Sequence, residues 1–198
     1  MITLTSGLYD VPNDQVAAIV TYLEIAAPVT SVSRPFPEGV TAQQERLDTT
    51  SYRTLFRAIG APWLWLSRLT LKDDALAAIL DNPQIELWVI RKQGAPIALI
   101  ELDFSVKGTC ELAFFGMVRS VTGQGLGGPM MALAQARAFQ GGVASLTVHT
   151  CTLDDPRALG FYLRAGFAPV RRAVEIFPDP RLDGLYDPTT APQIPCLP

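Results

Sequence analysis

Residues 118–128 read VRSVTGQGLGG and join a predicted strand to a predicted helix. Four of these eleven positions are glycine, which lets the backbone turn tightly and lets a ligand approach its amide groups closely. The first turn of a helix has unpaired N–H groups and the positive end of the helix dipole, and both suit a pyrophosphate. Pro129 falls in that first turn, where its missing N–H breaks no helical bond. These features favour a loop that binds phosphate.

Three interpretations of this glycine loop compete. The spacing Gly123-x-Gly125-x-x-Gly128 matches the dinucleotide-binding fingerprint, although that fingerprint follows the first strand of its unit, and here the three strands of a predicted antiparallel meander precede it. A structural turn with flexible glycines is the simplest interpretation. The third is a site for the pyrophosphate of coenzyme A. A nucleotide P-loop is excluded, because it needs a lysine and the last lysine of the chain is Lys107.

A second informative stretch, residues 155–167, reads DPRALGFYLRAGF. Asp155 is a good N-cap and Pro156 suits the first helical position. Gly166 can end the helix in the left-handed conformation. The stretch predicts a capped amphipathic helix of about three turns.

Together the two stretches resemble motifs A and B of the GNAT superfamily of N-acetyltransferases. The motif A pattern, Arg/Gln-x-x-Gly-x-Gly/Ala, falls on residues 122–127, with Thr122 at the first position. Motif B matches at Ala158, Tyr162, Gly166 and Phe167, with Asp155 in place of the usual asparagine. The motifs stand in the family's order with one predicted strand between them, and they cover residues 111–167.

This resemblance implies a mixed α/β (α+β) fold, with a mostly antiparallel central sheet flanked by helices and splayed around a coenzyme A cleft. It implies transfer of an acetyl group from acetyl-CoA to an amine, by direct attack in a ternary complex. A backbone N–H on the strand before the loop would polarise the thioester carbonyl. The expected cofactor contacts are Phe115, Met117, Val118, Thr122, Gly123, Gln124, Gly125, Leu126, Gly127, Gly128, Asp155 and Ala158.

The candidate catalytic residues are Tyr162, Glu111 and His149. Tyr162 corresponds to the family's tyrosine that protonates the leaving thiolate, and its alternative role is a core aromatic. His149 has the only side chain whose ordinary pKa is near neutrality. Glu111 shares a strand face with Ala113, Phe115 and Met117 if alternation is regular. The base is therefore His149 or Glu111, with Glu101 on the neighbouring strand as a further candidate. A nucleophilic Cys151 is disfavoured, because no basic cluster lowers its pKa.

Hydrophobic patterning predicts the remaining elements. Residues 52–65 contain the aromatic side chains Tyr52, Phe56, Trp63 and Trp65, which either pack helices on the sheet or line an acceptor pocket. Loops are expected at 28–39 and after 178. The predicted strands are 18–25, 86–91, 96–104, 110–118, 144–151 and 168–177, and the predicted helices are 41–59, 73–80, 155–165 and one from 126 that Gly141 ends.

Composition excludes several classes of protein. The 198 residues are 48% hydrophobic and 18% charged, which excludes a mainly disordered chain. A net charge of −3 disfavours a nucleic-acid partner. The longest uncharged stretch, residues 120–136, holds four glycines and a proline, so no membrane span is expected.

The chain is expected to be cytoplasmic and to bind no metal. It shows no signal peptide, its three cysteines include no Cys-x-x-Cys pair, and it has one histidine. We expect one domain over residues 1–177 and a proline-rich arm over 178–198. The expected partner is a small-molecule amine or a peptide amine. A homodimer stays open, as does a non-catalytic acyl-CoA-binding or structural role, since Thr122 and Asp155 depart from the motifs.

Overall fold

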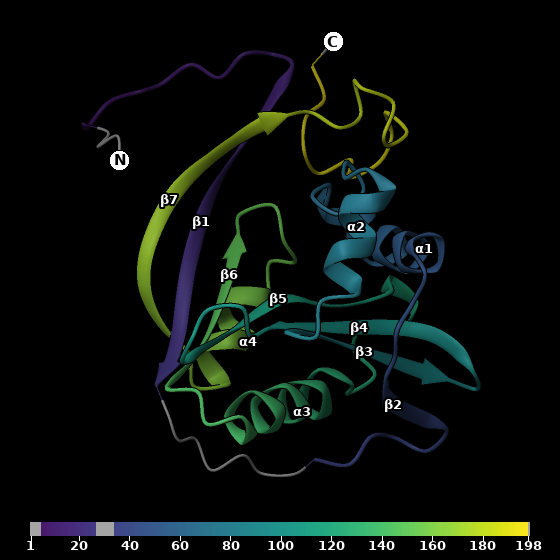
Figure 1. Cartoon of the computed structure of the whole chain (residues 1–198). Helices are drawn as coiled ribbons and strands as arrows, with labels where there is room; N and C mark the ends of the chain where they lie inside the picture. Colours follow the sequence, from purple (N-terminus) through teal and green to yellow (C-terminus); the bar gives the residue numbers. More distant parts are fainter. Residues whose placement is uncertain (1–4, 27–33, 198) are drawn as a thin grey trace.

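A seven-stranded sheet forms the centre of the protein (Figure 1). The structure is a computed structural model that describes residues 5–26 and 34–197. The strand order is β2-β3-β4-β5-β6-β1-β7, and all neighbours are antiparallel except β5 and β6. The strands are β1 (Gln15–Ala26), β2 (Val40–Gln44), β3 (Ile85–Lys92), β4 (Ala95–Asp103), β5 (Thr109–Met117), β6 (Ser145–Cys151) and β7 (Ala168–Pro178). The expected mixed, mostly antiparallel sheet is confirmed.

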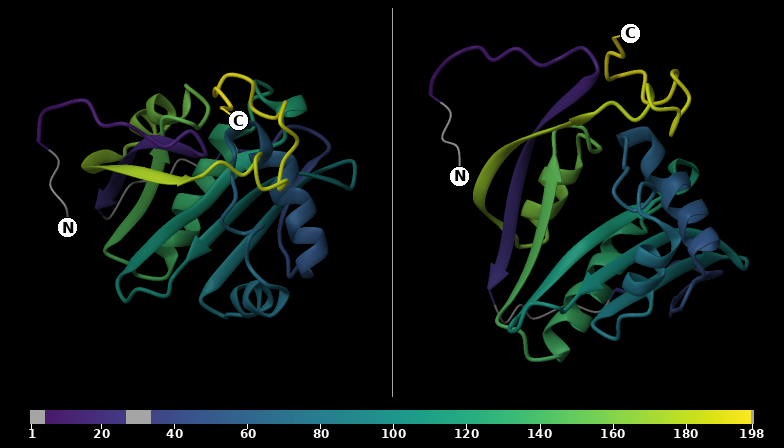
Figure 2. Two further views of the ribbon diagram at one scale, coloured as in Figure 1. Left: turned by 90° about the horizontal axis from the view of Figure 1, so that it is seen from above. Right: turned by 45° about the horizontal axis from the view of Figure 1, so that its top comes forward.

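The sheet splits between its two parallel strands. Residues 109–111 of β5 pair with residues 145–147 of β6, and the described strands show no pairing beyond that point. Both strands continue past it, so the halves β2–β5 and β6–β1–β7 diverge, as Figure 2 shows. A split of this kind leaves backbone groups on the facing sides of β5 and β6 without a strand partner.

Helices cover both faces of the sheet (Figure 1). One core joins α3 and α4 to the sheet and includes Met130, Ala134 and Tyr162. The other core joins α1, α2 and the C-terminal arm to the opposite face and includes Phe56 and Leu76. The helices are α1 (Thr49–Gly60), α2 (Asp73–Leu80), α3 (Gly127–Gln140) and α4 (Ala158–Arg164), with short 3₁₀ turns η1 (Ala61–Trp63) and η2 (Arg119–Val121).

Two predicted helices are shorter than expected. The prediction of a helix over 41–59 is wrong at its start, because residues 40–44 pair with β3 as an edge strand. Asp48 then begins α1 by accepting a hydrogen bond from the Ser51 N–H at 2.8 Å. The prediction that Asp155 caps a helix over 155–165 is also wrong. Its carboxylate accepts from the backbone and guanidinium of Arg157, and α4 begins three residues later.

The other predicted elements are confirmed to within a few residues. The loop predicted at 28–39 lies outside the described residues over 28–33, and its remaining part, 34–39, contains no helix or strand. The place of the first predicted strand in the sheet, however, cannot be predicted from the alternation of apolar and polar residues. β1 lies between β6 and β7 and pairs with both, so the beginning of the chain sits inside the C-terminal half of the sheet.

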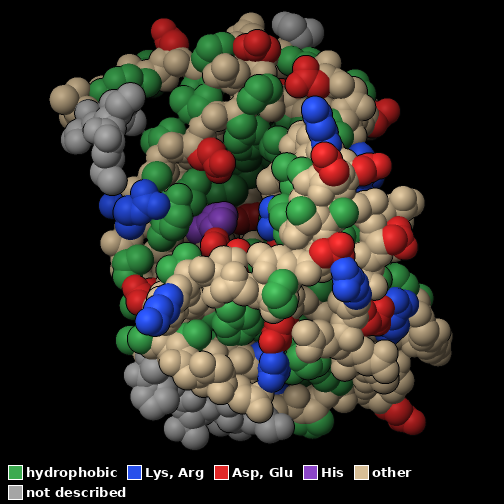
Figure 3. All heavy atoms as spheres, viewed as in Figure 1, with side chains coloured by type: hydrophobic (Ala, Val, Ile, Leu, Met, Phe, Trp, Pro, Cys, Tyr) green, Lys and Arg blue, Asp and Glu red, His purple; other side chains and the backbone are tan. Residues whose placement is uncertain are grey.

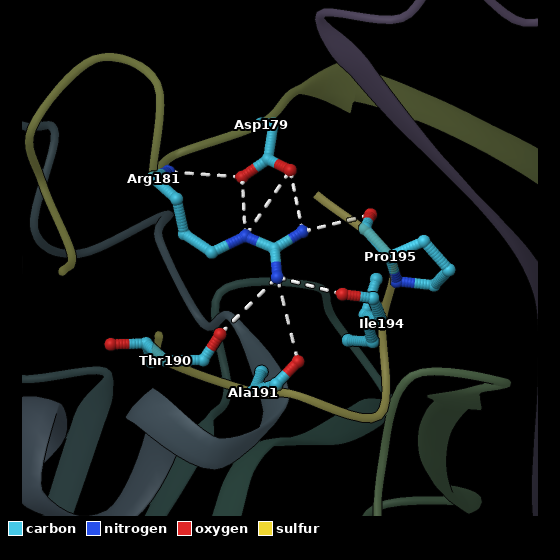
Figure 4. Close-up of polar contacts among 6 residues, drawn as sticks. All are labelled: Asp179, Arg181, Thr190, Ala191, Ile194 and Pro195. Carbon is cyan, nitrogen blue, oxygen red and sulfur yellow. Dashed lines mark hydrogen bonds and ion pairs between the residues drawn. The ribbon is translucent and has the colours of Figure 1, made fainter. Parts of the chain in front are cut away.

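Residues 179–197 form an irregular arm that is held by a buried ion pair (Figure 4). The side chains of Asp179 and Arg181 are 2% and 1% exposed. Arg181 donates to both carboxylate oxygens of Asp179, and to the carbonyl oxygens of residues 190, 191, 194 and 195. Outside this hydrogen-bond network, the Tyr186 hydroxyl donates to the Trp65 carbonyl oxygen at 2.5 Å. The arm therefore packs on the α1–η1 region of its own chain.

Candidate active site

The glycine loop presents an open backbone at the start of α3. Gly123 and Gly125 have φ angles of +83° and +81°, which side-chain-bearing residues rarely adopt. No atom lies within 4 Å of a Cβ built on either residue. Among the described residues, no side chain caps the N-terminus of α3. The first amides of α3 are thus available to an anion, and residues 122–128 fit a pyrophosphate.

Two cationic side chains approach this loop from other parts of the chain. A Cβ on Gly128 would lie 3.1 Å from Nη1 of Arg34, so this guanidinium lies beside the first turn of α3. Lys92, at the end of β3, donates from Nζ to Oε1 of Gln124 at 3.0 Å. Sequence reasoning missed both residues, because each is far from the loop in the chain and neither belongs to a motif.

A β-bulge in β5 overturns the expected alternation of faces. Glu101 pairs with Phe114 and Leu102 pairs with Leu112, so Ala113 is an extra residue. Phe115 and Met117 pack in the α3–α4 core, and Phe114 packs in the α1–α2 core. Before the bulge, Cys110 and Leu112 belong to the α3–α4 core, so Glu111 between them faces the α1–α2 side. The prediction that Glu111 shares a face with Phe115 and Met117 is therefore wrong.

The same strand directs two amides toward the split in the sheet. The Val118 N–H donates to the Ile97 carbonyl oxygen at 2.8 Å, so it points at β4 and is already occupied. Since successive amides alternate along a strand, those of Phe115 and Met117 point away from β4. They lie beyond the last pair between β5 and β6. Of the three predicted thioester contacts, these two have suitable backbone geometry.

Tyr162 lies in an aromatic cluster beside the split. Its ring centroid is 6.3 Å from that of Phe115 and 5.7 Å from those of Phe161 and Phe167. Burial raises the pKa of the phenol above its ordinary value, so the hydroxyl stays protonated at neutral pH. Phe161 also reaches the glycine loop, because a Cβ on Gly127 would lie 3.2 Å from its ring. α4 thus borders both the loop and β5.

The two motif B residues Asp155 and Ala158 lie at the start of α4. The Ala158 N–H donates to the Asp155 carbonyl oxygen at 2.8 Å. The Asp155 carboxylate is occupied by Arg157, whose hydrogen bonds lower the pKa of that carboxyl. The side chain of Asp155 is therefore committed to a local turn.

The structure brings the two candidate bases together. Nδ1 of His149 lies 3.5 Å from Oε1 of Glu111, and each side chain is about half exposed, at 46% and 47%. Interaction with Glu111 is the main cause that raises the pKa of His149 above 6.5, with smaller contributions from Asp154 and Glu175. Figure 3 shows His149, the chain's single histidine, inside a deep depression of the surface, which we call the central hollow.

Other candidate groups are less available for chemistry. Glu101 is fully buried and accepts hydrogen bonds from the Tyr52 hydroxyl at 2.5 Å and from Nη2 of Arg68 at 2.7 Å. Burial raises the pKa of Cys151 to about 11, so its thiol is protonated at neutral pH. Neither group is placed as a free base or nucleophile.

The aromatic stretch divides between packing and lining. Tyr52 and Phe56 are buried in the α1–α2 core. The Trp65 ring lies 5.4 Å from that of Phe114 in a tilted arrangement, and its Nε1 donates to Asp154 at 3.2 Å, so Trp65 connects the segment after η1 with the loop after β6. Trp63 borders a cavity of about 420 Å³ beneath the C-terminal arm. Packing thus accounts for at least two of the four aromatic residues.

Replacing Gly60 with alanine is expected to destabilise the fold by about 1–3 kcal/mol, because overpacking forces neighbours to move. A Cβ on Gly60 would lie 2.4 Å from the Trp65 Cβ. Urea unfolding measures the change. The matched control is Gly141→Ala, where the nearest atom lies at an ordinary 3.8 Å. Equal stability of the two variants would contradict the prediction.

Neither a membrane helix nor a metal cluster is found within residues 5–26 and 34–197. No helix there is long and apolar enough to cross a bilayer. No group of three or more metal-ligating side chains is present in the same residues.

Comparison with solved structures identifies similar folds. A GCN5-related N-acetyltransferase from Kribbella flavida aligns with a TM-score of 0.56 and 23% identity, over 86% of this chain and 63% of that one. A GCN5-related N-acetyltransferase from Sphaerobacter thermophilus aligns with a TM-score of 0.59 and 18% identity, over 82% and 52%. The ribosomal-protein-S18-alanine N-acetyltransferase of Escherichia coli aligns with a TM-score of 0.55 and 14% identity, over 71% and 94%.

At the level of sequence, the chain matches the model of a protein family. The chain spans 52% and 63% of the two GCN5-related structures. No curated protein matches it. The model of the Acetyltransferase (GNAT) family matches residues 50–167, which is more than half of the chain and includes both sequence motifs. The chain belongs to the GNAT acetyltransferase family.

Proposed function

We propose that this chain transfers an acetyl group from acetyl-CoA to an amine, in a ternary complex. The observation that carries the proposal is the position of the glycine loop. It presents free helix amides at one end of the split between β5 and β6, and the His149–Glu111 pair lies along the same two strands. In this proposal the glycine loop binds the pyrophosphate of acetyl-CoA, and the thioester end of the molecule lies between β5 and β6. The amine acceptor meets it beside the His149–Glu111 pair.

The residues have separate roles in this proposal. The amides of Gly123 and of residues 125–128 bind the pyrophosphate, whereas the Gln124 amide already donates to the Val121 carbonyl oxygen; Arg34 adds positive charge. The free amides of Phe115 and Met117 stabilise the oxyanion of the thioester carbonyl. His149, held by Glu111, takes a proton from the attacking amine, and Tyr162 gives a proton to the leaving thiolate. One C–N bond forms and one C–S bond breaks.

Calorimetric titration with acetyl-CoA is the first test, followed by an acceptor screen that detects thiol release. We expect binding, and release with at least one amine. Among similar structures, one is named an aminoglycoside acetyltransferase and another acts on ribosomal protein S18. The screen therefore includes aminoglycosides, amino acids and peptides. Absence of binding at millimolar acetyl-CoA would refute the proposal. Light scattering of the same sample tests whether the chain is a homodimer.

A non-catalytic acyl-CoA-binding role is the second candidate. Thr122 supplies no cation at the first motif position, and Asp155 is occupied by Arg157. Binding of acetyl-CoA without thiol release for any acceptor would favour this role. Binding of a nicotinamide dinucleotide in place of acetyl-CoA would instead support the dinucleotide interpretation.

Replacing Arg34 with glutamine is expected to weaken acetyl-CoA binding about tenfold, because a charge-assisted hydrogen bond to phosphate contributes on the order of 1.5–3 kcal/mol. Calorimetry at two salt concentrations measures the loss. The control is Arg46→Gln, which removes an exposed arginine paired with Asp81. An unchanged dissociation constant for the Arg34 variant would exclude this residue from the phosphate site.

The pH dependence of turnover follows from the interaction between His149 and Glu111. Because Glu111 stabilises the imidazolium, His149 becomes a competent base only as the pH rises through a pKa above 6.5. The rate should therefore rise with pH on that limb. Glu111→Gln removes the stabilising charge, so the limb should move to lower pH. Glu38→Gln, an exposed carboxylate elsewhere, serves as control. A limb that stays in place would exclude His149 as the base.

A further inference from the structure

Arg68 is a cation held in place near the His149–Glu111 pair. It lies between η1 and α2, and its guanidinium carbon sits 4.9 Å from the centroid of the Phe114 ring. Nη2 donates to the buried Glu101 at 2.7 Å. The cation–π contact and the ion pair both hold the guanidinium, while the Arg68 side chain keeps 18% of its surface exposed.

The hydrogen-bonding capacity of Arg68 is only partly used. A guanidinium carries five N–H donors. Within the part of the chain that the structure describes, Arg68 donates to Glu101 alone, and its Nε is buried without a partner. Glu101 also accepts from Tyr52, so one carboxylate serves both side chains. Nε of Arg53 is also buried without a partner in the described residues, so the unpartnered Nε of Arg68 does not identify a ligand by itself. The 18% of the Arg68 side chain that is exposed is the part that a ligand can reach.

The strand register places this guanidinium next to the proposed base. Glu101 pairs with Phe114, and Asp103 pairs with Glu111. Phe114 and Glu111 are therefore two β4 positions apart on one face, roughly 7 Å along the strand. In Figure 3, acidic and basic side chains gather around the histidine in the central hollow. The residue under the Arg68 guanidinium and the carboxylate that holds His149 thus lie on one face of β5, two β4 positions apart.

We propose that Arg68 binds the carboxylate of the acceptor, and that the acceptor is a free α-amino acid. The inference rests on the proposed acetyl transfer. The ammonium group would lie at His149 and Glu111, and the carboxylate at Arg68. The nitrogen and a carboxylate oxygen of an α-amino acid are three covalent bonds apart, so with a hydrogen bond of about 3 Å at each end the molecule can bridge a gap of roughly 7 Å.

The reaction balances with these groups. The ammonium group of the amino acid loses one proton to His149, and the amine nitrogen then attacks the thioester carbonyl carbon, forming a C–N bond and releasing its second proton to solvent. The C–S bond then breaks, and Tyr162 protonates the thiolate. The products are an N-acetylamino acid and coenzyme A, and solvent exchanges the proton from His149 back to Tyr162.

Matched acceptors test the inference in the unaltered chain. Each amino acid is compared with its decarboxylated amine and its carboxamide, for example tryptophan, tryptamine and tryptophanamide, by thiol release. We expect kcat/KM to be at least about tenfold higher for the free amino acid, as for a lost charge-assisted hydrogen bond. Equal or better use of the amine or the amide overturns the inference but leaves acetyl transfer intact. No release with any amine overturns acetyl transfer itself.

An arginine variant and a matched control locate the effect. Arg68→Lys keeps the charge beside Glu101 but loses the planar fork, so KM for the amino acid should rise about tenfold with little change in kcat. The preference over the decarboxylated amine should shrink by the same factor. Arg53→Lys alters another partly buried arginine, which pairs with Asp73 and the Leu71 carbonyl oxygen, and should leave the preference unchanged. A retained preference in a folded Arg68 variant would overturn the assignment.

Discussion

Replacing Arg181 with methionine is expected to destabilise the protein by about 3–5 kcal/mol, which is the typical effect of removing one partner of a buried ion pair. The variant leaves the Asp179 carboxylate buried without its cation. It also leaves the carbonyl oxygens of the arm without a donor. Urea unfolding gives the change in free energy, and proteolysis shows whether the arm is released first.

The chain contains a matched control for this experiment. Asp155-Pro156-Arg157 repeats the tripeptide of Asp179-Pro180-Arg181. It makes the same backbone and side-chain hydrogen bonds, at 2.9, 2.9 and 2.6 Å. However, the Arg157 side chain is 66% exposed, and exposed pairs contribute little. Arg157→Met should therefore change stability far less, and similar losses in the two variants would contradict the explanation by burial.

Acid should release the arm by the same mechanism. Hydrogen bonds from Arg181 lower the pKa of Asp179 below 3.8, so the pair stabilises the fold fully above that pH. The stabilisation is lost as the pH falls through the lowered pKa. The Arg181→Met variant should lack this dependence.

Replacing Tyr162 with phenylalanine is expected to lower kcat by about 10²–10⁴-fold, the usual contribution of a general acid. The ring of phenylalanine preserves the contacts with Phe115, Phe161 and Phe167, so acetyl-CoA affinity and folding should change little. Single-turnover kinetics with a substrate from the acceptor screen measures the step, and calorimetry measures the affinity.

The control for this variant is Tyr9→Phe, which removes a hydroxyl from a tyrosine that is 50% exposed. Its turnover should match that of the unaltered chain. If Tyr162→Phe also keeps its rate within twofold, Tyr162 is a packing residue only. The proton for the thiolate would then come from solvent.

Local signals predicted the elements that carry both motifs. Gly166 adopts the left-handed conformation that was predicted for the end of its helix, with a φ angle of +98°. Segments in which apolar and polar residues alternate clearly form strands in the structure, because alternation places the apolar side chains on one face that can be buried. The wrong prediction of a helix over residues 41–48 is explained by the absence of such a pattern. Those residues carry no strong periodicity, and pairing with β3 decided their conformation.

Long-range contacts account for what sequence reasoning missed. Ala113 is a bulge only because of its register with β4, and this register moved Glu111 to the face opposite Phe115. Arg34 and Arg68 reach the site from segments without a motif. The two Asp-Pro-Arg tripeptides differ in burial although their local sequence is the same. Such differences depend on tertiary packing, which a single stretch of sequence does not contain.

The place of β1 has a consequence for how the chain folds. Residues 15–26 are synthesised before their strand partners, which are residues 145–151 and 168–178. A strand with partners so distant in sequence stays unpaired until those partners have been synthesised, and high contact order slows folding. Its alternating apolar residues are then exposed, with the hazard of pairing to another chain. We therefore expect the half of the sheet that carries His149 to form later than the β2–β5 half, whose strands are closer together in sequence.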